Sequence, residues 1–466
     1  MTELLNYLNS PHLVANFQKV FGIESQFDSN LDSHHLHHNI KINGHLNAKK
    51  SPVVIKSANI NKLETSKIQT RSRSTINNNS NGSVTLVSNG YSNGSTVTTT
   101  ILKKTVSNED ENDTKTHKRQ LSGVKKFVNN TDHTNIVANT TIHIKFWYYF
   151  FRLGAAMGNE IFYCLFFPFW FWNVDGAIAR KVGFLWGIYM TVGQATKDLL
   201  CMPRPASPPV VKLEQRYIAE FGFPSTHAMV SAGLPISVVV LSYSRYNIDL
   251  PLSIAIACLF CCWVCCSRLY LGMHSLLDVI AGVLYSILVL LLFIPILEPI
   301  DKFMLENMYS PLIALTVGFA LSHFYPSLKQ WSTARGDTTI IIGTVVGFTI
   351  GSFLNNNLGL LNKPANPPLY DIHFPNALGY VFGVVRTILG LLIILATRQF
   401  FKFSLLRFLC HFHNLNPKDP VSKQQKKIEL PYNYLTYFAI GLNIAFTSPY
   451  VFRLLNIERD YSYTEL

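Results

Sequence analysis

The pattern of apolar and polar positions divides the chain near residue 142. Residues 1–142 are rich in Asn, Ser, Thr, Lys and His and contain no sustained apolar period. Such a segment cannot bury enough apolar surface to offset the entropy lost on ordering, so the sequence predicts a disordered, low-complexity N-terminal region. From residue 143 onward, long apolar stretches alternate with loops that are rich in proline and charge.

Most of these apolar stretches approach the ~20 residues that a helix needs to cross the hydrocarbon layer of a membrane. They lie at 146–173, 181–201, 228–244, 250–267, 276–297, 309–326, 338–356, 376–397 and 432–453. We therefore expect an all-α fold, a polytopic membrane helix bundle with about eight or nine spans. Residues 143–300 are expected to form its core, and residues 301–466 to add further membrane helices and a short tail.

Composition and charge support this interpretation. Only 14% of the residues are charged, whereas soluble domains carry about a quarter. The formal net charge of +13 resides largely in the N-terminal region and in loops, for example at Lys418 and Lys423. Basic loops are typical of the flanks of membrane helices, so we expect no nucleic-acid partner.

The first segment with reactive side chains is KDLLCMPRP, from Lys197 to Pro205. Lys197 is expected on the last turns of the second apolar helix, and the two prolines should end that helix around Arg204. About two helical turns separate the two cations, so both can face one site. Alternatively, both side chains extend to lipid headgroups at the end of a membrane helix.

The second segment, FGFPSTH, opens the third apolar helix and ends at His227. A helix N-terminus offers free backbone N–H groups and the positive end of the helix dipole, which together favour a phosphate. Ser225 can cap the helix or donate to a phosphate oxygen, and His227 can transfer a proton near neutral pH. The alternative is an ordinary capped helix that contains a histidine by chance.

The third segment, SRLYLGMHSLLD, joins the fourth and fifth apolar helices. If the fifth helix begins near His274, then His274 and Asp278 are four residues apart and share a face. A carboxylate beside one imidazole nitrogen fixes the tautomer and makes the other nitrogen a better nucleophile. A structural salt bridge could also satisfy Asp278, but it would leave Arg268 and the second histidine unexplained.

Together these segments supply two histidines, one carboxylate, three cations and a helix N-terminus. This set suits hydrolysis of a phosphate monoester, in which one histidine attacks phosphorus, the cations neutralise the equatorial oxygens and the other histidine protonates the leaving alkoxide. No cluster of Asp and Glu suitable for magnesium accompanies the segments. We therefore expect neither a metal nor another cofactor.

The three segments resemble, in order and spacing, the signature motifs of the type 2 phosphatidic acid phosphatase superfamily. The resemblance implies a phosphate-binding set formed by Lys197, Arg204, Ser225, Thr226 and Arg268. It also implies that His274 is the nucleophile that forms a phosphohistidine, that Asp278 orients it, and that His227 is the general acid.

One departure from the common pattern narrows the resemblance. Thr226 stands where the second motif most often has glycine, and the form PSTHAM, preceded by Glu220-Phe-Gly-Phe, is similar to the sphingosine-1-phosphate phosphatase branch. The upstream run GNEIFYCLFFPFWFWNVD and the additional spans after the core are also similar to that branch. This implies a multi-pass protein of the endoplasmic reticulum membrane. Its implied substrates are sphingoid base phosphates. The Asn-rich N-terminus suggests a fungal member, for which dihydrosphingosine- and phytosphingosine-1-phosphate would be the natural substrates.

Two alternatives and one conflict stay open at this stage. The motifs bind phosphate and not lipid, so phosphatidate or a polyprenyl pyrophosphate is an alternative substrate, and a non-catalytic lipid transporter is an alternative class.

With nine spans, the motif loops share a side with the N-terminal region and the basic loop 398–431. The positive-inside rule makes that side cytosolic, whereas the resemblance implies a lumenal site. The span 146–173 is weak because Arg152 and Glu160 interrupt it, and removing it from the count would reconcile the two.

Overall fold

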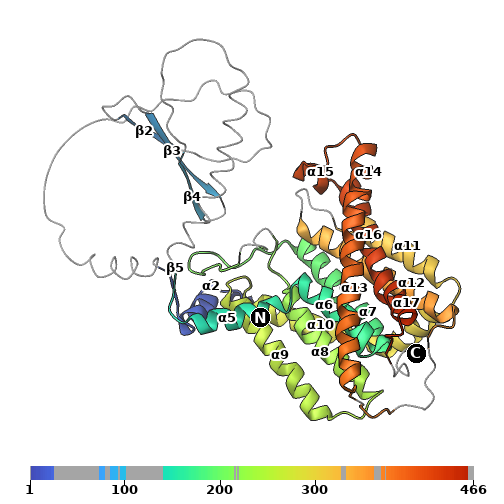
Figure 1. The fold of residues 1–466 in the computed structure, drawn as a ribbon. Helices are drawn as coiled ribbons and strands as arrows, with labels where there is room; N and C mark the ends of the chain where they lie inside the picture. Colours follow the sequence, from blue (N-terminus) through green and yellow to red (C-terminus); the bar gives the residue numbers. More distant parts are fainter. Residues whose placement is uncertain are drawn as a thin grey trace, which may run out of the picture. The chain divides into compact units, whose positions relative to one another are not determined.

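The computed structural model describes residues 2–25, 73–78, 84–92, 95–100, 140–214, 217, 220–326, 332–361, 369–372 and 374–459, and it is mostly helical (Figure 1). The chain divides into two units. His37–His133 forms the smaller one, which contains an antiparallel sheet of β2 (Arg73–Asn78), β3 (Val84–Ser92) and β4 (Ser95–Thr100) in that order. The larger unit, Met1–Leu36 with Thr134–Leu466, contains the helices.

The larger unit is built almost entirely from helices. In chain order these are α1 (Thr2–Leu8), α2 (Pro11–Val20), α5 (Lys145–Ala156), α6 (Glu160–Asn173), α7 (Gly176–Leu200), α8 (Thr226–Tyr243), α9 (Leu250–Tyr270), α10 (Leu276–Glu306), α11 (Ser310–His323), α12 (Thr333–Asn357), α13 (Ala377–Phe403), α14 (Leu405–Phe412), α15 (Pro420–Gln424), α16 (Lys426–Leu442), the π-helical turn η1 (Asn443–Thr447) and α17 (Ser448–Leu454). Two short strands, β1 (Ile23–Ser25) and β5 (Thr140–Ile142), pair antiparallel.

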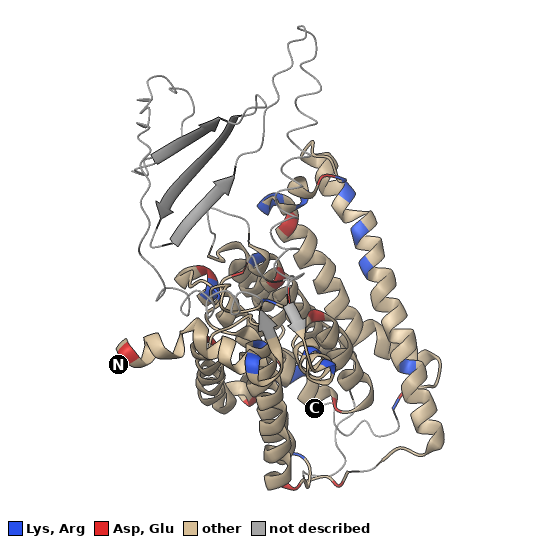
Figure 2. Ribbon diagram, turned by 90° about the vertical axis from the view of Figure 1, so that its left-hand side faces the viewer, with Lys and Arg blue, Asp and Glu red and all other residues tan. Residues whose placement is uncertain are grey.

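The predicted helical membrane bundle is confirmed, but the count of about eight or nine spans is not. Within the described residues, six helical segments are long and apolar enough to cross a membrane: Thr226–Tyr243, Leu250–Tyr270, Leu276–Glu306, Thr333–Asn357, Ala377–Phe412 and Lys426–Leu454. Figure 2 shows that most positions along the helices are neither Lys, Arg, Asp nor Glu. The protein is therefore a multi-pass membrane protein.

Three other stretches that the sequence predicts as membrane spans are not among these six segments, and the structure shows why. The stretch 146–173 is two helices, α5 and α6, because the chain turns at residues 157–159. The stretch 309–326 forms α11, which has only 14 residues. The helix α7 is long, but it carries four charged side chains that are buried against other helices: Arg180, Lys181, Lys197 and Asp198.

Polar caps determine where the core helices begin. Asp175 accepts the N–H of Ile178 at 2.9 Å at the start of α7. Ser225 caps α8, and at the start of α10 Ser275 and Asp278 form a reciprocal capping box. Caps of this kind satisfy backbone donors that a helix leaves unpaired. The residues next to Ser225 and Ser275 are consequently held in fixed positions.

Close packing around α7 and α12 holds the bundle together. The helix α7 packs against α6, α8, α10 and α12, and Arg180 donates two hydrogen bonds to Asp301 of α10, at 2.6 and 2.7 Å. The helices α12 and α16 approach so closely that a Cβ atom on Gly347 would lie 2.1 Å from the carbonyl oxygen of Phe438. The C-terminal helices are therefore packed directly onto the core that carries the three motifs.

The beginning of the chain differs from the sequence-based expectation of disorder. Residues 2–25 form α1, α2 and β1, and Val14, Gln18 and Ile23 are almost fully buried. The side-chain amide of Gln18 donates to the carbonyl oxygens of Val211 (2.7 Å) and Tyr270 (2.9 Å). These contacts join segments that are far apart in the sequence, so no local sequence pattern predicts them. Residues 26–72 and 101–139, also expected to be disordered, lie outside the described residues.

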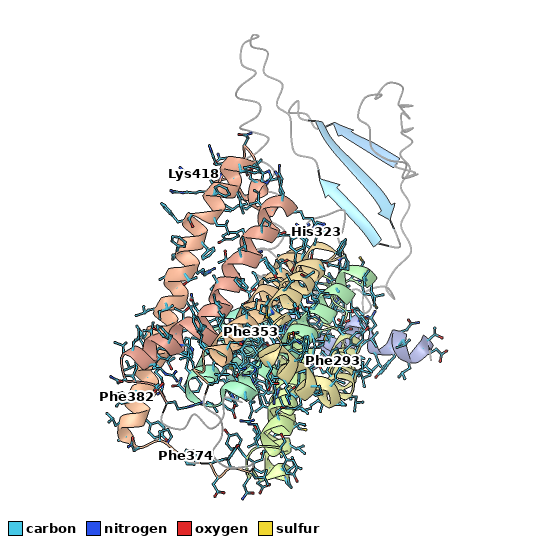
Figure 3. The ribbon with its side chains drawn as sticks, turned by 90° about the vertical axis from the view of Figure 1, so that its right-hand side faces the viewer. Phe293, His323, Phe353, Phe374, Phe382 and Lys418 are labelled. Carbon is cyan, nitrogen blue, oxygen red and sulfur yellow. The ribbon has the colours of Figure 1, made fainter. Side chains whose placement is uncertain are left out.

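Several loops meet at one end of the larger unit. Figure 3 shows His323 and Lys418 at this end and Phe374 at the opposite one. Lys426 donates to the carbonyl oxygen of His323 at 2.9 Å, which joins the basic loop to the end of α11. Because Thr333, at the start of α12, donates to Glu220 at 2.6 Å, the loop between α7 and α8 lies at the same end.

Candidate active site

The three segments singled out in the sequence converge at this end of the unit. The junction is formed by the end of α7, the start of α8 and the turn between α9 and α10. All eight predicted site residues lie here, and their side chains are almost fully buried: Lys197, Arg204, Ser225, Thr226, His227, Arg268, His274 and Asp278. Charged side chains are rarely buried unless they are paired, so their partners indicate how the site is built.

Lys197 projects from the last turn of α7 between two partners. Its ammonium group forms an ion pair with Glu220 at 3.1 Å and donates to the hydroxyl of Thr226 at 3.3 Å. Thr226 is the first residue of α8, so Lys197 lies beside a helix N-terminus, where backbone N–H groups favour an anion.

Arg204 reaches the site from the loop and not from a continuing helix. The helix α7 ends at Leu200, and Cys201 adopts a left-handed conformation with φ of 52°. The Arg204 guanidinium donates to the carbonyl oxygens of Glu220 (2.8 Å) and Met273 (2.7 Å). These two bonds tie the first motif to the third, so the convergence does not depend on the helical spacing that the sequence suggested.

His274 lies between Arg204 and Asp278. Its Nε2 atom is 3.2 Å from Nη1 of Arg204, and its Nδ1 atom is 3.6 Å from Oδ2 of Asp278. Since a guanidinium can only donate, Nε2 must be the accepting nitrogen, and Nδ1 carries the proton on the side of Asp278. His274 precedes the cap of α10, and Asp278 is held by the N–H of Ser275 at 2.8 Å. This tautomer leaves a lone pair on Nε2, as a nucleophile requires.

His227 faces the same cavity from the first turn of α8. Its Nε2 atom is 3.3 Å from Oδ1 of Asn159, in the turn between α5 and α6. A Cβ atom on the adjacent Gly158 would lie 2.1 Å from Cδ2 of His227. The absence of a side chain at residue 158 therefore makes room for the imidazole ring.

Arg268 is the most deeply buried cation of the site. Its side chain is 0% exposed, and its Nη1 atom is 3.0 Å from Oε2 of Glu214. Among the described residues, none accepts a hydrogen bond from its Nε or Nη2 atoms. Buried donors without acceptors are costly, and an oxyanion bound between these donors would satisfy them.

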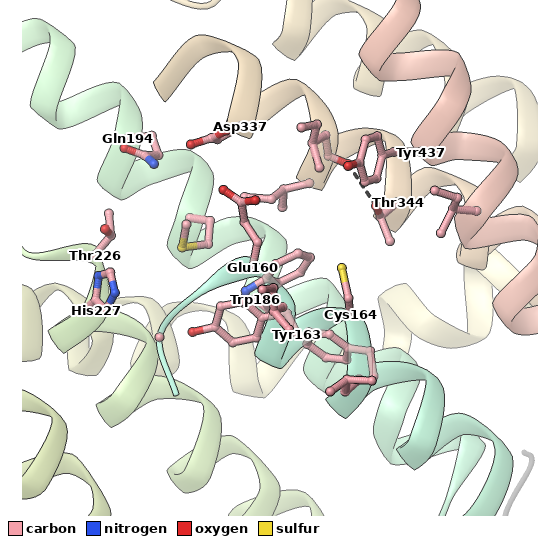
Figure 4. A pocket seen from close by; sticks show the side chains of 18 of the residues that line it. Glu160, Tyr163, Cys164, Trp186, Gln194, Thr226, His227, Asp337, Thr344 and Tyr437 are labelled. Carbon is pink, nitrogen blue, oxygen red and sulfur yellow. Dashed lines mark hydrogen bonds between the residues drawn. The ribbon is translucent and has the colours of Figure 1, made fainter. Parts of the chain in front are cut away.

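These side chains line a cavity of about 410 Å³. At one end lie Lys197, Arg204, Arg268, His227 and His274; the other end is formed largely by apolar side chains of α6, α12, α13, α16 and η1. Figure 4 shows Thr226 and His227 on one side of this cavity and Tyr437 on the opposite side. A ligand with an anionic head and an apolar body matches this division.

Burial and neighbouring charges shift the pKa values of three loop residues of the site, Arg204, Glu220 and His274. Burial lowers the pKa of Arg204 to about 10, although Glu220 opposes the shift. Burial raises the pKa of the Glu220 carboxyl, but Lys197, Thr333 and Arg204 outweigh this and hold it below its usual value. Burial, together with Arg204, Arg268 and Lys197, lowers the pKa of His274 well below its usual 6.5. The His274 imidazole is therefore neutral at neutral pH.

The sequence interpretation missed three partners of the predicted residues. Glu220 and Glu214 pair with the cations, and Asn159 contacts His227. Glu220 and Asn159 fall within runs that carried the family resemblance, so they could have been singled out there. Glu214 lies in a loop without a pattern, and its pairing depends on tertiary structure. In the described part of the chain, no group of three or more His, Cys, Asp or Glu side chains could hold a metal ion.

Comparisons with known proteins match the chain to phosphatases. Residues 178–300 match the family model of the PAP2 superfamily. The chain is 42% identical over 322 residues to Sphingosine-1-phosphate phosphatase 1 of Mus musculus, covering 67% of this chain and 73% of that protein. It is 36% identical over 314 residues to Sphingosine-1-phosphate phosphatase 2 of Homo sapiens, covering 67% and 79%.

A more distant relative is named for a different sphingoid base phosphate. Over 298 residues the chain is 26% identical to a dihydrosphingosine 1-phosphate phosphatase of Schizosaccharomyces pombe, covering 60% of this chain and 68% of the relative. No solved structure matches the chain. The likeness to these relatives extends well beyond the three motifs.

Proposed function

Because the chain belongs to the sphingosine-1-phosphate phosphatases of the PAP2 superfamily, we propose that it hydrolyses sphingoid base 1-phosphates to the free base and phosphate. The observation that carries this proposal is the convergence of three cations, two histidines and a helix N-terminus at one end of a largely apolar cavity. The relatives' names supply the lipid class, since they act on sphingosine-1-phosphate or dihydrosphingosine 1-phosphate.

We propose that His274 is the nucleophile of the first step. Its Nε2 lone pair attacks phosphorus and forms the N–P bond while the P–O bond to the lipid breaks. Lys197, Arg204 and Arg268 neutralise the equatorial oxygens, and Ser225 and the backbone N–H of Thr226 complete the phosphate-binding set. Asp278 keeps the proton on Nδ1 and stabilises the positive charge that develops on the ring. Support comes from the contacts of His274 with Arg204 and Asp278.

His227 acts as general acid and then as general base in this proposal. As an imidazolium it gives a proton to the leaving alkoxide, and the resulting neutral ring then takes a proton from the water that attacks the phosphohistidine, which releases phosphate and restores both His274 and the His227 imidazolium. Asn159 accepts a hydrogen bond from Nε2 of His227 and orients the ring. No step in this sequence uses a metal or a cofactor.

We further propose that the protein acts in the endoplasmic reticulum membrane. The six candidate spans place it in a membrane, and resemblance to the sphingosine-1-phosphate phosphatase branch supports this compartment. Co-localisation of the tagged full chain with a marker of this membrane in a fungal cell tests the proposal, and residence at the plasma membrane would contradict it.

The substrate assignment is tested by phosphate release from a panel of lipid phosphates. The purified full-length protein in detergent is given dihydrosphingosine-1-phosphate, phosphatidate and a polyprenyl pyrophosphate. We expect kcat/KM to be at least about tenfold higher for the sphingoid base phosphate, as a pocket that contacts the headgroup can provide. Equal rates on phosphatidate would exclude the assignment, and no release from any substrate would exclude a phosphatase.

A further inference from the structure

Glu220 is a buried carboxylate among the phosphate-binding cations, and the proposed reaction does not use it. Its side chain is only 5% exposed. Its Oε2 atom accepts a hydrogen bond from Lys197 at 3.1 Å and lies 3.9 Å from Nη2 of Arg204. A bound phosphate needs the same two cations. The carboxylate and the phosphate therefore compete for them, and the strength of the carboxylate contacts affects how tightly phosphate binds.

The other oxygen of Glu220 is held from a different part of the chain. Its Oε1 atom accepts a hydrogen bond at 2.6 Å from the hydroxyl of Thr333, the first residue of α12. The superfamily model matches residues 178–300, so Thr333 lies beyond the matched stretch. The carboxylate is consequently shared between the cations of the core and one of the helices that follow it.

Two hydrogen bonds fix the start of α12 against α7. The hydroxyl of Tyr325 donates to Oδ2 of Asp198 at 3.1 Å, and the hydroxyl of Ser332 donates to Oδ1 at 3.3 Å. Asp198 directly follows Lys197 on α7. The start of α12 is therefore tied to the helix that carries Lys197, which holds the Thr333 hydroxyl in place.

On this basis we propose that Thr333 is a positioning residue that limits how strongly Glu220 competes with phosphate for Lys197 and Arg204. The inference rests on the proposed function and adds a determinant of phosphate affinity to it. Thr333 acts through Glu220 and not by touching the substrate. An ammonium group has three donors and a guanidinium five, so cations that hold only one oxygen of the carboxylate keep donors available for phosphate.

Loss of the Thr333 hydroxyl has an expected direction. The Oε1 atom of Glu220 would lose this donor inside the protein, and leaving a charged acceptor unpaired there is costly. Lys197 and Arg204 are the donors on the other side of the carboxylate. The carboxylate then binds these cations with both oxygens, and phosphate displaces it less readily.

Inorganic phosphate and a matched pair of substitutions test this inference. The full-length protein in detergent is assayed with dihydrosphingosine-1-phosphate, and the inhibition constant of inorganic phosphate is measured. Thr333→Val keeps the shape of the side chain and removes its hydroxyl. We expect KM and the inhibition constant each to rise by about tenfold. We expect kcat to stay nearly unchanged, because the competition affects the ground state and the transition state alike. Thr333→Ser, which keeps the hydroxyl, should match the wild type.

A double-substitution cycle separates this role from a purely structural one. In a Glu220→Gln background the carboxylate is absent, so adding Thr333→Val should no longer change KM or the inhibition constant. If Glu220→Gln lowers turnover too far for kinetics, calorimetric titration with inorganic phosphate gives the same comparison as a ratio of dissociation constants.

A second buried hydroxyl of α12 provides the control. Thr339 donates to the carbonyl oxygen of Arg335 within the helix at 2.9 Å, and Thr339→Val should leave KM and phosphate inhibition unchanged. Three results would overturn the inference: wild-type values in Thr333→Val, a fall in kcat without a rise in KM, or the same rise with and without the Glu220 carboxylate. In each case phosphate release by the wild type would leave the proposed function standing.

Discussion

His274 is surrounded by groups that keep its ring neutral and correctly oriented. Three cations lie near it, and Arg204 donates to its Nε2 atom. Arg204 can exchange this contact for a phosphate oxygen when substrate binds, which frees the Nε2 lone pair. Glu220 partly neutralises Lys197 and Arg204, so these two buried cations are not left unpaired before substrate binds.

The lowered pKa of His274 predicts how activity depends on pH. A lowered pKa means that the neutral nucleophile persists as the pH falls through 6.5, so the acid limb of kcat/KM should lie below that value. Arg204→Gln removes one of the charges that depress the pKa and should move the acid limb to higher pH, at a lower overall rate. Profiles of kcat/KM for both proteins on the same substrate check this. An acid limb that does not move, or that moves down, would contradict it.

The close approach of Gly158 to His227 predicts that a side chain at residue 158 would displace the imidazole ring. In Gly158→Ala the new Cβ atom would lie 2.1 Å from Cδ2 of His227, so the ring must leave its position beside Asn159. We expect kcat to fall by about a hundredfold or more, the usual contribution of a general acid. Gly176→Ala is the matched control, because a Cβ atom there meets nothing within 4 Å. Similar activities of the two variants would show that residue 158 does not position His227.

At the residue scale the sequence singled out eight side chains that the structure brings together, but it missed several of their pairings. These eight could be singled out because each motif carries a strong local pattern, such as the Pro residues around Arg204. Glu214 lies 54 positions before its partner Arg268 in the chain (268 − 214). Asn159 lies 68 positions before His227 (227 − 159). Contacts of that range depend on the tertiary fold, which periodicity does not encode.

The helices also show where sequence patterns stop being informative. Apolar length located α8 to α13 and α16, because a membrane helix must be long and apolar, whereas α14 and α15 lie in the stretch expected to be a basic loop. The break between α5 and α6 was missed, since apolar composition continues on both sides of the turn at 157–159. That turn adjoins the proposed active site, because Gly158 and Asn159 both lie against His227. The same apolar pattern gave no indication that α12 and α16 approach backbone to backbone.

The contact between α12 and α16 gives a prediction at this scale. In Gly347→Ala the added Cβ atom would lie 2.1 Å from the carbonyl oxygen of Phe438, and the two helices must separate. Overpacking of this kind costs about 1–3 kcal/mol. We expect a lower thermal unfolding midpoint for the detergent-solubilised protein, with Gly176→Ala as the control. A midpoint equal to that of the wild type would mean that the helices separate without cost.

For the whole molecule, the contacts bring the N-terminal segment to the same side as the active site. Gln18 binds the backbone near both motif loops, and β1 pairs with β5. Residues 2–25 and 140–142 therefore lie on this side, and the sequence between them contains no apolar run long enough to span a membrane. The basic loop lies at this end too. Residues 2–25 therefore lie on the same side as the motif loops, whereas the sequence allowed the N-terminal region to be moved across the membrane as a way to reconcile its topology signals.

Glycosylation mapping tests this shared side. The native sequon at Asn129 and a sequon inserted between residues 206 and 209 should give the same result, both glycosylated or both unmodified, when the protein is made in a eukaryotic cell. The measurement is a mobility shift that endoglycosidase removes. Modification of one sequon without the other would place the N-terminal region and the motif loops on opposite sides of the membrane.

The most direct measurement for the whole account is capture of the phosphoenzyme during turnover. The wild-type protein is mixed with ³²P-labelled dihydrosphingosine-1-phosphate, quenched in alkali, which preserves phosphohistidine, and the label is mapped by mass spectrometry. We predict label on His274, lost in His274→Ala together with phosphate release, and accumulated in His227→Ala if hydrolysis becomes the slower step. Phosphate release by His274→Ala, or label on any other residue, would contradict the account.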